Sequence, residues 1–414
     1  MKILVIGKGG REHALAWKLA QEAEVWVTPG NPLISKEIPC FDVKETDFAG
    51  LIALCGRLQP DLIVVGPEDP LVNGLADFLT KDGFNVFGPR QGGASLEGSK
   101  AFSKQVMIEA GVPTGESGTF RDAELAADYA RARFDAGKQV VVKASGNALG
   151  KGVFVCSTLD EAEDAIGAML VERAFGEAGD EIVIEDRLIG REFSLLTVVG
   201  DHGFFSLPVA QDYKRALDND RGPNTGGMGT YSPCDWAQPY VEQVEQSIVA
   251  PTVNWLKSRG VEYRGVLFSG IMVQDGQPYC LEFNVRFGDP ETQSVLRRIG
   301  PGFANLLLES ATGKPLTSVP ILQNAAVSVV LASQGYPGRI AKGKPITIDK
   351  MPEGVKVFGS GIGDQNGQLV TDGGRVITIS AEAKTVEEAR KLAYLAAESI
   401  DFEGKQFRSD IAAI

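Results

Sequence analysis

The sequence is poor in the residues that build zinc sites and disulfide frameworks. Its 414 residues include only two histidines and five cysteines. His13 and His202 lie far apart in the chain, so they do not suggest a zinc site. No two cysteines form a CxxC pair, and an odd number does not suit a set of disulfides. We therefore expect a cytoplasmic protein whose thiols are mostly structural.

Long apolar runs and a surplus of basic charge are absent as well. No run approaches the roughly 18 apolar residues of a membrane span. The opening MKILVIGKGG has only four apolar residues in succession before Gly7, which predicts a first strand and not a signal peptide. The net charge of −13 disfavours a nucleic-acid partner, because such partners need a basic face. A local cluster of Lys and Arg could still bind a small anion.

Three common catalytic signatures are also missing. There is no GxSxG elbow, so a Ser–His–Asp hydrolase has no support. The GxxxxGK[ST] spacing of a P-loop is absent. The turn GKGGREH (7–13) does not complete GxGxxG, because Glu12 stands where the third glycine would be. The chain contains no internal repeat, coiled coil or low-complexity tract.

Strand and helix signals alternate through the first part of the chain. Short apolar runs at 3–6, 25–27, 62–65 and 85–88 are separated by helical patterns. This periodicity predicts βαβ units, and hence a parallel sheet with helices on its faces, to about residue 100. A length of 414 residues corresponds to two to four domains of roughly 100–200 residues each.

The rest of the chain divides into three further parts. A compact unit at roughly 115–190 contains a strand, a Gly-rich turn and a returning strand at 140–156, followed by an amphipathic helix at 159–170. Longer strands come next, with one long Gly-rich loop at 220–233. The last part, about 325–414, combines strands, Gly turns and a helix.

The stretch EFNVRFGDPETQ (282–293) carries the strongest chemical signal. Residues two apart on a strand share a face, so Glu282 and Asn284 should point the same way, opposite to Phe283. Oxygen ligands of this kind suit Mg2+, which binds through one or two protein ligands and substrate phosphates. Arg286 continues the alternation and could grip an anion with its fork of donors. A solvated loop would explain the polarity of the stretch but not the shared face.

Two Gly-rich turns could bind phosphate. In GKGGREH (7–13), backbone N–H groups at a helix N-terminus could approach an anion, and Arg11 and His13 favour that interpretation over a simple tight turn. In KASGNALGKGV (143–153), Lys143 ends an apolar strand, and the flexible hairpin could fold over the phosphates of a nucleotide. An exposed turn is the alternative there.

Two further stretches are weaker signals. IVIEDRLIGRE (182–192) ends a strand with Glu185 and could frame an adenine, with a carboxylate on the ribose. The loop GPNTGGMG (222–229), preceded by Asp212 and Lys214, suits closure over a ligand but could equally be a mobile surface loop.

Six motifs in this order resemble the phosphoribosylamine–glycine ligases (glycinamide ribonucleotide synthetases), an ATP-grasp family of purine biosynthesis. They are GKGGREHA, VGPEDPLV, LEGSKAFSK, KASGNALGKGV, GPNTGGMGTYSP and EFNVRFGDPETQ, and the resemblance runs from residue 1 to the end. It implies that ATP, glycine and 5-phosphoribosylamine give ADP, phosphate and glycinamide ribonucleotide through a glycyl phosphate. It also implies small-molecule substrates and a monomer or weak homo-oligomer.

The resemblance implies a multidomain fold of mixed α/β and α+β class. An N-terminal doubly wound parallel sheet would span 1–100. The ATP-grasp core would comprise 101–119 and 190–324, and its mobile lid 120–189. A small C-terminal α+β domain would span 325–414.

The resemblance also implies roles for individual residues. The ATP-binding positions would be Lys104, Lys143, Gly146, Gly150, Lys151, Gly152, Glu185, Leu188 and Glu192. Mg2+, or Mn2+ in its place, would be held by Glu282 and Asn284. Glycine and phosphoribosylamine would lie near Gly9, Gly10, Arg11, Glu68, Asp212, Lys214, Asn224, Thr225, Gly226, Arg286, Asp289 and Glu291. Lys143, Asp212 and Arg286 are the expected catalytic residues.

The chain departs from the family pattern at two places. Asn147, Ala148 and Leu149 stand where the family often has LAA, and Arg191 stands where an acidic residue is common beside the ribose carboxylate. Two alternatives stay open: another ATP-grasp ligase, including a biotin-carboxylase-like enzyme, and a non-catalytic nucleotide-binding regulator that uses the GKGG turn.

Overall fold

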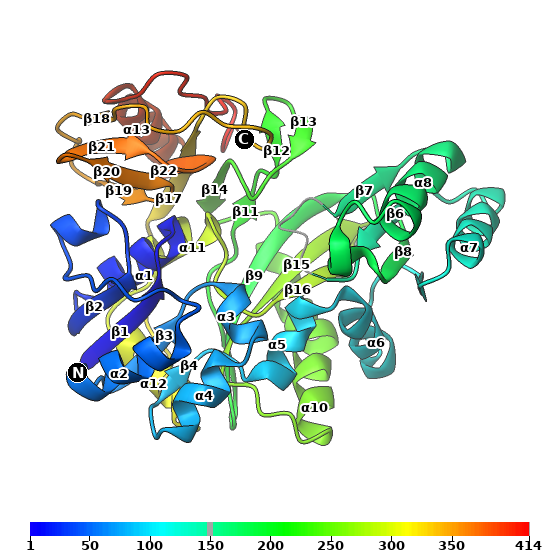
Figure 1. The fold of residues 1–414 in the computed structure, drawn as a ribbon, viewed down its shortest axis with the longest axis horizontal. Coiled ribbons are helices and arrows are strands. Elements are labelled where there is room, and N and C mark those ends of the chain that lie inside the picture. The colour runs from blue at the N-terminus through cyan, green and yellow to red at the C-terminus, as the bar shows by residue number, and fades with distance from the viewer. Residues whose placement is uncertain (147–151, 414) are drawn as a thin grey trace.

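The computed structural model describes residues 1–146 and 152–413. Its N-terminal part is a four-stranded parallel sheet in the order β2-β1-β3-β4, shown in blue in Figure 1. The strands are β1 (Lys2–Gly7), β2 (Glu24–Pro29), β3 (Leu62–Val65) and β4 (Val86–Phe87). The helices between them are α1 (Gly10–Leu19), α2 (Phe48–Leu58), α3 (Glu68–Val72) and α4 (Leu75–Lys81). All four predicted strands are confirmed.

The parallel sheet is covered on both faces, because alternate residues of β1 enter different cores. Ile3 and Val5 belong to the core that includes the apolar face of α1. Leu4 and Ile6 belong to the core that includes α2 and α4. A strand buried on both sides has no polar face to alternate with, which is why β1 is almost continuously apolar.

A second unit projects from the body at the right of Figure 1. It is an antiparallel sheet in the order β5-β8-β6-β7 with its own small apolar core. The strands are β5 (Ser117–Phe120), β6 (Val140–Ala144), β7 (Val153–Cys156) and β8 (Ile182–Asp186), and the helices are α7 (Ala123–Asp135) and α8 (Leu159–Ile166). The predicted strand–turn–strand pairing of β6 with β7 is confirmed.

The central sheet is antiparallel, in the order β10-β9-β15-β16. Its strands are β9 (Arg191–Gly200), β10 (Gly203–Ser206), β15 (Gly265–Gln274) and β16 (Gln277–Asn284). β15 and β16 form a hairpin, with Asp275 and Gly276 at positive φ in its turn. The neighbouring helices are α5 (Gln91–Gly98), α6 (Lys100–Ala110), α9 (Val241–Val244), α10 (Ala250–Ser258), α11 (Glu291–Val295) and α12 (Phe303–Ala311).

A third antiparallel sheet, in the order β11-β14-β17-β22-β19, joins the middle of the chain to its C-terminal part. Its strands are β11 (Gln211–Asp212), β14 (Gly229–Ser232), β17 (Ala325–Ala332), β19 (Val355–Gly359) and β22 (Arg375–Ala383), and α13 (Val386–Glu398) packs on it. Short pairs complete the fold: β12 (Arg215–Leu217) with β13 (Arg221–Asn224), β18 (Thr347–Ile348) with β23 (Ile400–Asp401), and β20 (Ile362–Gln365) with β21 (Gln368–Thr371).

The expectation of one long loop at 220–233 is wrong. This stretch contains β13 and the buried strand β14, which pairs with β17. Glycine at position 229 lets the strand approach its neighbour, since a Cβ there would lie 2.7 Å from Ser328 O. The glycines made the stretch look irregular, and the partner strand of β14 lies about a hundred residues later in the chain. Pairing at that separation leaves no local pattern.

None of the helices in the described part of the chain combines the length and apolar character needed to cross a bilayer.

Candidate functional site

Three buried charged side chains from three different elements meet beside the central sheet. Lys104 of α6, Lys143 of β6 and Glu185 of β8 are at most 7% exposed, and both lysines form ion pairs with Glu185. Burial opposes the charged form of Glu185, but the two lysines outweigh it and lower its pKa. Burial lowers the pKa of Lys104, whereas Glu185 and Glu282 outweigh burial at Lys143 and raise its pKa. Two lysines against one shared carboxylate leave a cationic spot suited to a phosphate.

Glu282, near the end of β16, is surrounded by four cationic side chains. They are Lys214, Lys143, Lys100 and Arg286. Burial would raise the pKa of Glu282, but these neighbours lower it to about 2. Lys214 Nζ lies 4.0 Å from Glu282 Oε1. The carboxylate is therefore ionised at neutral pH, as a ligand for a hard divalent cation must be.

The predicted alternation of faces along 282–287 is present. Phe283, Val285 and Phe287 are buried, whereas Glu282, Asn284 and Arg286 are only partly so. β16 ends at Asn284, but the alternation continues past that end.

Arg286 lies at the centre of a charged network. Its Nη2 donates to Asn284 Oδ1 (3.2 Å) and forms an ion pair with Glu97 Oε1 (2.9 Å), and its Nε donates to Glu68 Oε2 (3.3 Å). Burial raises the pKa of Glu97 to about 7 despite Arg286. At Glu68 burial is outweighed by Arg286 and Arg11, which lower the pKa to about 2. The arrangement holds the guanidinium plane beside the metal-ligand candidates.

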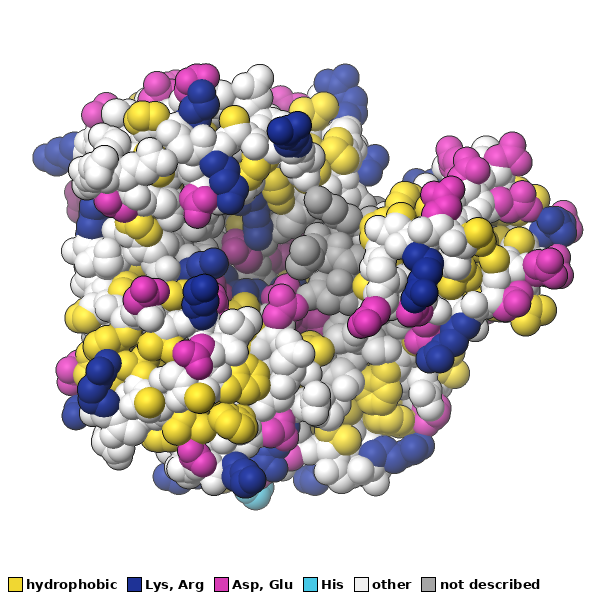
Figure 2. All heavy atoms as spheres, in the orientation of Figure 1, with side chains coloured by type: hydrophobic (Ala, Val, Ile, Leu, Met, Phe, Trp, Pro, Cys, Tyr) yellow, Lys and Arg dark blue, Asp and Glu magenta, His cyan; other side chains and the backbone are white. Residues whose placement is uncertain are grey.

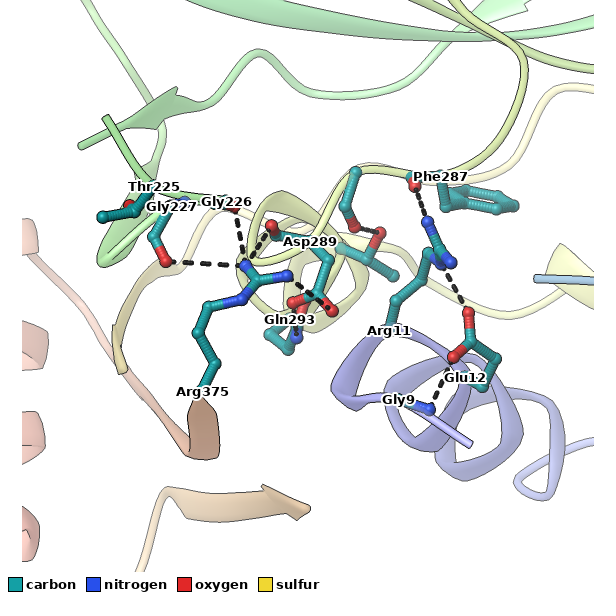
Figure 3. Close-up of polar contacts among 12 residues, drawn as sticks. Gly9, Arg11, Glu12, Thr225, Gly226, Gly227, Phe287, Asp289, Gln293 and Arg375 are labelled. Atoms are coloured by element: carbon teal, nitrogen blue, oxygen red, sulfur yellow. Dashed lines mark hydrogen bonds and ion pairs between the residues drawn. The ribbon is translucent and has the colours of Figure 1, made fainter. Parts of the chain in front are cut away.

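The GKGG turn already holds a carboxylate of the chain itself. Gly9 is the N-cap of α1 and donates its backbone N–H to Glu12 Oε2 at 2.7 Å. Arg11 Nε donates to Glu12 Oε1 (2.5 Å), and Arg11 Nη1 to Phe287 O (3.1 Å), as Figure 3 shows. A phosphate at Gly9 and Gly10 would have to share these donors with Glu12, so this contact stays a prediction.

His13, which together with Arg11 favoured an anion site at this turn, lies in the core. Its side chain is completely buried, and Nδ1 accepts the backbone N–H of Gly359 at 2.9 Å. Its ring meets Phe358 edge-on, with centroids 5.4 Å apart. Burial lowers its pKa. His13 therefore packs α1 against β19 as a neutral ring.

Two carboxyl groups with raised pKa values lie near Lys214. Burial raises the pKa of Asp212 to about 7, against the influence of Lys214, and it also raises the pKa of Glu291. Burial is outweighed at Lys214 by Asp212, Glu192 and Glu282, so its pKa is well above the usual value. Lys214 Nζ lies 3.4 Å from Glu192 Oε2. The predicted ribose carboxylate and the predicted amine-side residues are thus neighbours.

Arg375 of β22 joins the loop after β13 to the turn before α11. Its Nη1 donates to Gly226 O (2.7 Å) and Asp289 O (2.5 Å), and its Nη2 lies 3.4 Å from Asp289 Oδ2 (Figure 3). Gln293 Nε2 donates to the other carboxylate oxygen of Asp289 at 2.8 Å. Gly227 is required here, because its φ is +108° and a Cβ would lie 2.4 Å from Pro290 Cδ.

The other predicted loop residues separate into two groups. Thr225 donates both its backbone N–H (2.7 Å) and its hydroxyl (2.9 Å) to Lys214 O. Asn224 is exposed, and its Oδ1 accepts from Arg215 Nη1 at 3.2 Å. Thr225 is therefore attached to Lys214, and Asn224 is part of the hairpin formed by β12 and β13.

The Gly-rich hairpin is described only at its ends. Gly146 donates its N–H to Ala178 O (3.0 Å), and a Cβ there would lie 2.7 Å from Ala178 Cα. Gly152 closes the other end through its carbonyl, which accepts a backbone N–H of β6. Gly150 and Lys151 lie outside the described residues, as do Asn147, Ala148 and Leu149, where the chain departs from the family pattern.

Leu188 and Glu192 flank the crossing from β8 to β9, and both are partly buried. Between them, Arg191 stacks over the ring of Trp236, with its guanidinium carbon 4.1 Å from the ring centroid. This cation–π contact accounts for the unusual residue beside the ribose carboxylate candidate.

Three charged residues around Glu282, Arg286 and Asp289 were not predicted: Lys100, Glu97 and Arg375. Lys100 and Glu97 stand in LEGSKAFSK, a motif in which only Lys104 was predicted to bind a ligand. Arg375 opens the apolar strand RVITISA, and a charge at such a position was the available signal. In Figure 2, acidic and basic side chains lie together in the hollow at the centre of the face. Among residues 1–146 and 152–413, no three His, Cys, Asp or Glu side chains gather so as to hold a metal by themselves.

Family models match most of the chain. The N domain of phosphoribosylglycinamide synthetase matches residues 1–97, its ATP-grasp (A) domain 98–292 and its C domain 326–414. The phosphoribosylamine–glycine ligase of Pasteurella multocida (strain Pm70) is 42% identical over 420 residues, covering 99% of this chain and 97% of that protein.

Solved structures agree with these matches. The phosphoribosylamine–glycine ligase of Thermotoga maritima is 35% identical, with a TM-score of 0.87 over 99% of this chain and 100% of that one. A biotin carboxylase from Campylobacter jejuni is 17% identical, with a TM-score of 0.73 over 98% of this chain and 92% of that one. At that identity the second similarity shows a shared fold alone.

Proposed function

The chain belongs to the phosphoribosylglycinamide synthetase family, and from this premise we propose that it is a ligase that joins glycine to 5-phosphoribosylamine with ATP, through a glycyl phosphate. The observation that carries the proposal is the position of Glu282. Lys214, on the amine side, has its Nζ 4.0 Å from Glu282 Oε1, and Lys143, on the nucleotide side, donates to the carbonyl of the preceding residue, Leu281, at 3.4 Å. A site that transfers a phosphoryl group from nucleotide to substrate needs cations on both sides of the metal.

The chemistry starts from a carboxylate, which is a poor acyl donor because its oxygen leaves badly. An oxygen of the glycine carboxylate attacks the γ-phosphorus of ATP, the bond to the β-phosphate oxygen breaks, and ADP leaves. The amine then attacks the carbonyl carbon, and phosphate departs with the carboxylate oxygen it received. Lys104, Lys143 and Arg286 neutralise charge in the first step, and Asp212 orients the amine in the second.

The donor set fits a divalent cation. Glu282 supplies an ionised carboxylate, and Asn284 supplies an amide oxygen that here accepts a hydrogen bond from Arg286. Two protein oxygens are enough for Mg2+, or Mn2+ in its place, when phosphates complete the shell. The cation would supply charge neutralisation on the phosphates.

Glycyl phosphate hydrolyses in water, so the site must exclude water while this intermediate is present. We propose that residues 223–229, which join β13 to β14, cover the site; most of the Gly-rich hairpin, the other expected cover, lies outside the described residues. The cytoplasm is the proposed location, consistent with five free cysteines, four of them buried. A monomer or weak homo-oligomer stays a prediction.

The deciding experiment is ADP release in the presence of ATP and Mg2+, with phosphoribosylamine formed in situ from ribose 5-phosphate and ammonia. We expect release only when both glycine and phosphoribosylamine are present. Release that needs bicarbonate instead would favour a biotin-carboxylase-like enzyme. Binding of NAD(P) by a folded protein that does not turn over ATP would favour the regulator.

A further inference from the structure

The segment 213–227 is held near both ends by arginines from the C-terminal part of the chain. We propose that Arg375 and Arg408 are positioning residues that clamp this segment, and so hold Lys214 beside Glu282. The inference rests on the proposed function, and it gives the C-terminal part a role in the amine-side half of the reaction.

Arg408 makes the first attachment. It is only 1% exposed, although it lies six residues from the C-terminus. Its Nη1 donates to Asp220 Oδ1 (2.8 Å) and to Arg215 O (3.1 Å), and its guanidinium lies 4.9 Å from the ring centroid of Tyr213. Asp410 fixes the guanidinium with two bonds of 2.7 Å. A fully buried guanidinium with this many partners holds one geometry.

Backbone contacts of the tail reinforce that attachment. Ser409 donates its N–H to Asp218 Oδ1 (2.8 Å) and its hydroxyl to Asp218 Oδ2 (2.5 Å). Asn219 donates its N–H to Asp410 Oδ2 (2.8 Å), and Ala412 donates its N–H to the hydroxyl of Tyr213 (3.0 Å). Residues 408–412 therefore contact the start of the segment, β12 and the turn that joins β12 to β13.

Arg375 makes the second attachment, at the far end of the segment. Its Nη1 donates to the carbonyls of Gly226 and Asp289, so the loop and the turn before α11 share one donor (Figure 3). Tyr336 adds a bond from the same part of the chain, since its hydroxyl accepts the N–H of Gly226 at 3.0 Å.

The two attachments converge on Lys214. Thr225 closes the base of the hairpin by donating twice to Lys214 O. With the hairpin fixed at both ends, Lys214 Nζ is kept within 3.4 Å of Glu192 and 4.0 Å of Glu282. Most of the nucleotide side is built on α6, β6 and β8, and the ribose candidate Glu192 is held by the pairing of β9 with β15, so loosening the clamp should affect ATP binding much less than glycine use.

The test compares Arg375→Met, Arg408→Met and Asp220→Asn with the parent enzyme. Asp220→Asn is the mildest, because that side chain is 72% exposed and the change removes only the charged pair with Arg408. Lys391→Met is the matched control, since Lys391 pairs with Glu387 on the exposed face of α13. The measurements are kcat/KM for glycine and phosphoribosylamine, ATP affinity, and the ratio of ADP released to product formed.

We expect both arginine variants to lose about tenfold or more in kcat/KM for glycine, the effect of one lost charge-assisted hydrogen bond. Asp220→Asn should lose about threefold, since Arg408 keeps its other partners. ATP affinity should stay within about twofold, and the ADP-to-product ratio should rise above one because glycyl phosphate reaches water. Arg375→Lys should recover part of the loss, since it keeps one donor. The control should match the parent.

A readout without catalysis separates this inference from the proposed function. Trypsin should cut faster after Arg215 and Arg221 in the arginine variants, and Mg-ATP should not protect these sites. Parental cleavage rates, parental kcat/KM in folded variants, or an equal loss of ATP affinity would each overturn the clamp. If Arg408→Met does not fold, Asp220→Asn and Arg375→Met still decide between these outcomes. Failure of the parent to release ADP with glycine would instead refute the proposed function.

Discussion

Replacing Arg286 by lysine keeps one positive charge beside Glu282 but removes the planar fork. In the parent, the fork serves Glu97 at 2.9 Å, Asn284 at 3.2 Å and Glu68 at 3.3 Å at the same time. A single ammonium on a flexible stem cannot span all three acceptors. The change therefore tests geometry rather than charge.

Two magnitudes follow from this geometry. The lysine keeps one charged contact and loses the other, so we count the loss of one charged contact, either the ion pair with Glu97 or the hydrogen bond to Glu68, worth about 1.5–3 kcal/mol. The free energy of unfolding should fall by about 2 kcal/mol. If the fork also stabilises the transferring phosphoryl group, turnover should fall about a hundredfold, or about 2.7 kcal/mol in the barrier.

Arg264 provides a matched control. Its guanidinium also bridges two carboxylates, Asp201 (2.7 Å) and Glu262 (2.6 Å), and its side chain is 27% exposed against 18% for Arg286. It contacts the end of α12 through Ala311 O, away from the cluster around Glu282. Arg264→Lys should therefore lose similar stability in urea unfolding and keep parental glycine-dependent ADP release.

The reasoning is refuted if Arg286→Lys retains turnover within about threefold of the parent while its stability falls as expected. That result would leave Arg286 as a bridge between two carboxylates and nothing more. An equal loss of turnover in both lysine variants would point to general destabilisation.

Three further predictions rest on single features. Glu282→Gln should raise the Mg2+ concentration for half-maximal activity at least about tenfold, because the amide replaces an anionic ligand; activity titrations with Mg2+ check this. The pKa of Glu97, raised to about 7, means that the folded chain binds its proton more tightly than the unfolded chain. The free energy of unfolding should thus fall as the pH rises from about 5 to about 8. Glu97→Gln should make this fall smaller in urea unfolding. Gly227→Ala should cost about 1–3 kcal/mol and slow turnover, because of its positive φ and the approach of Pro290, whereas Gly276→Ala, with open space around it, should cost less and leave turnover unchanged.

Much of the fold could be predicted from the local periodicity of the sequence. The parallel strands, α2 and the hairpin of β15 with β16 were predictable because each has a repeating pattern within about ten residues. The alternation from Glu282 to Phe287 was readable for the same reason. β14 was not, because a short Gly-flanked strand is defined only by its distant partner β17.

Prediction of the site from the sequence is likewise limited to residues that lie close together in the chain. Glu282, Asn284 and Arg286 share one strand face, so their proximity follows from sequence. Arg375 reaches Asp289 only through the pairing of β22 in the third sheet, and no local pattern encodes that contact. His13 misled for a related reason: a histidine beside a Gly-rich turn resembles an anion ligand, but helix α1 turns it into the core.

The most direct test of the central claim is the fate of the oxygen atoms of glycine. The enzyme would be supplied with ATP, Mg2+, phosphoribosylamine and glycine whose carboxylate carries heavy oxygen, and the phosphate would be analysed by mass spectrometry. Activation through glycyl phosphate predicts one labelled oxygen in each phosphate released and one in each product amide. Unlabelled phosphate, released together with glycinamide ribonucleotide, would contradict phosphoryl transfer to glycine.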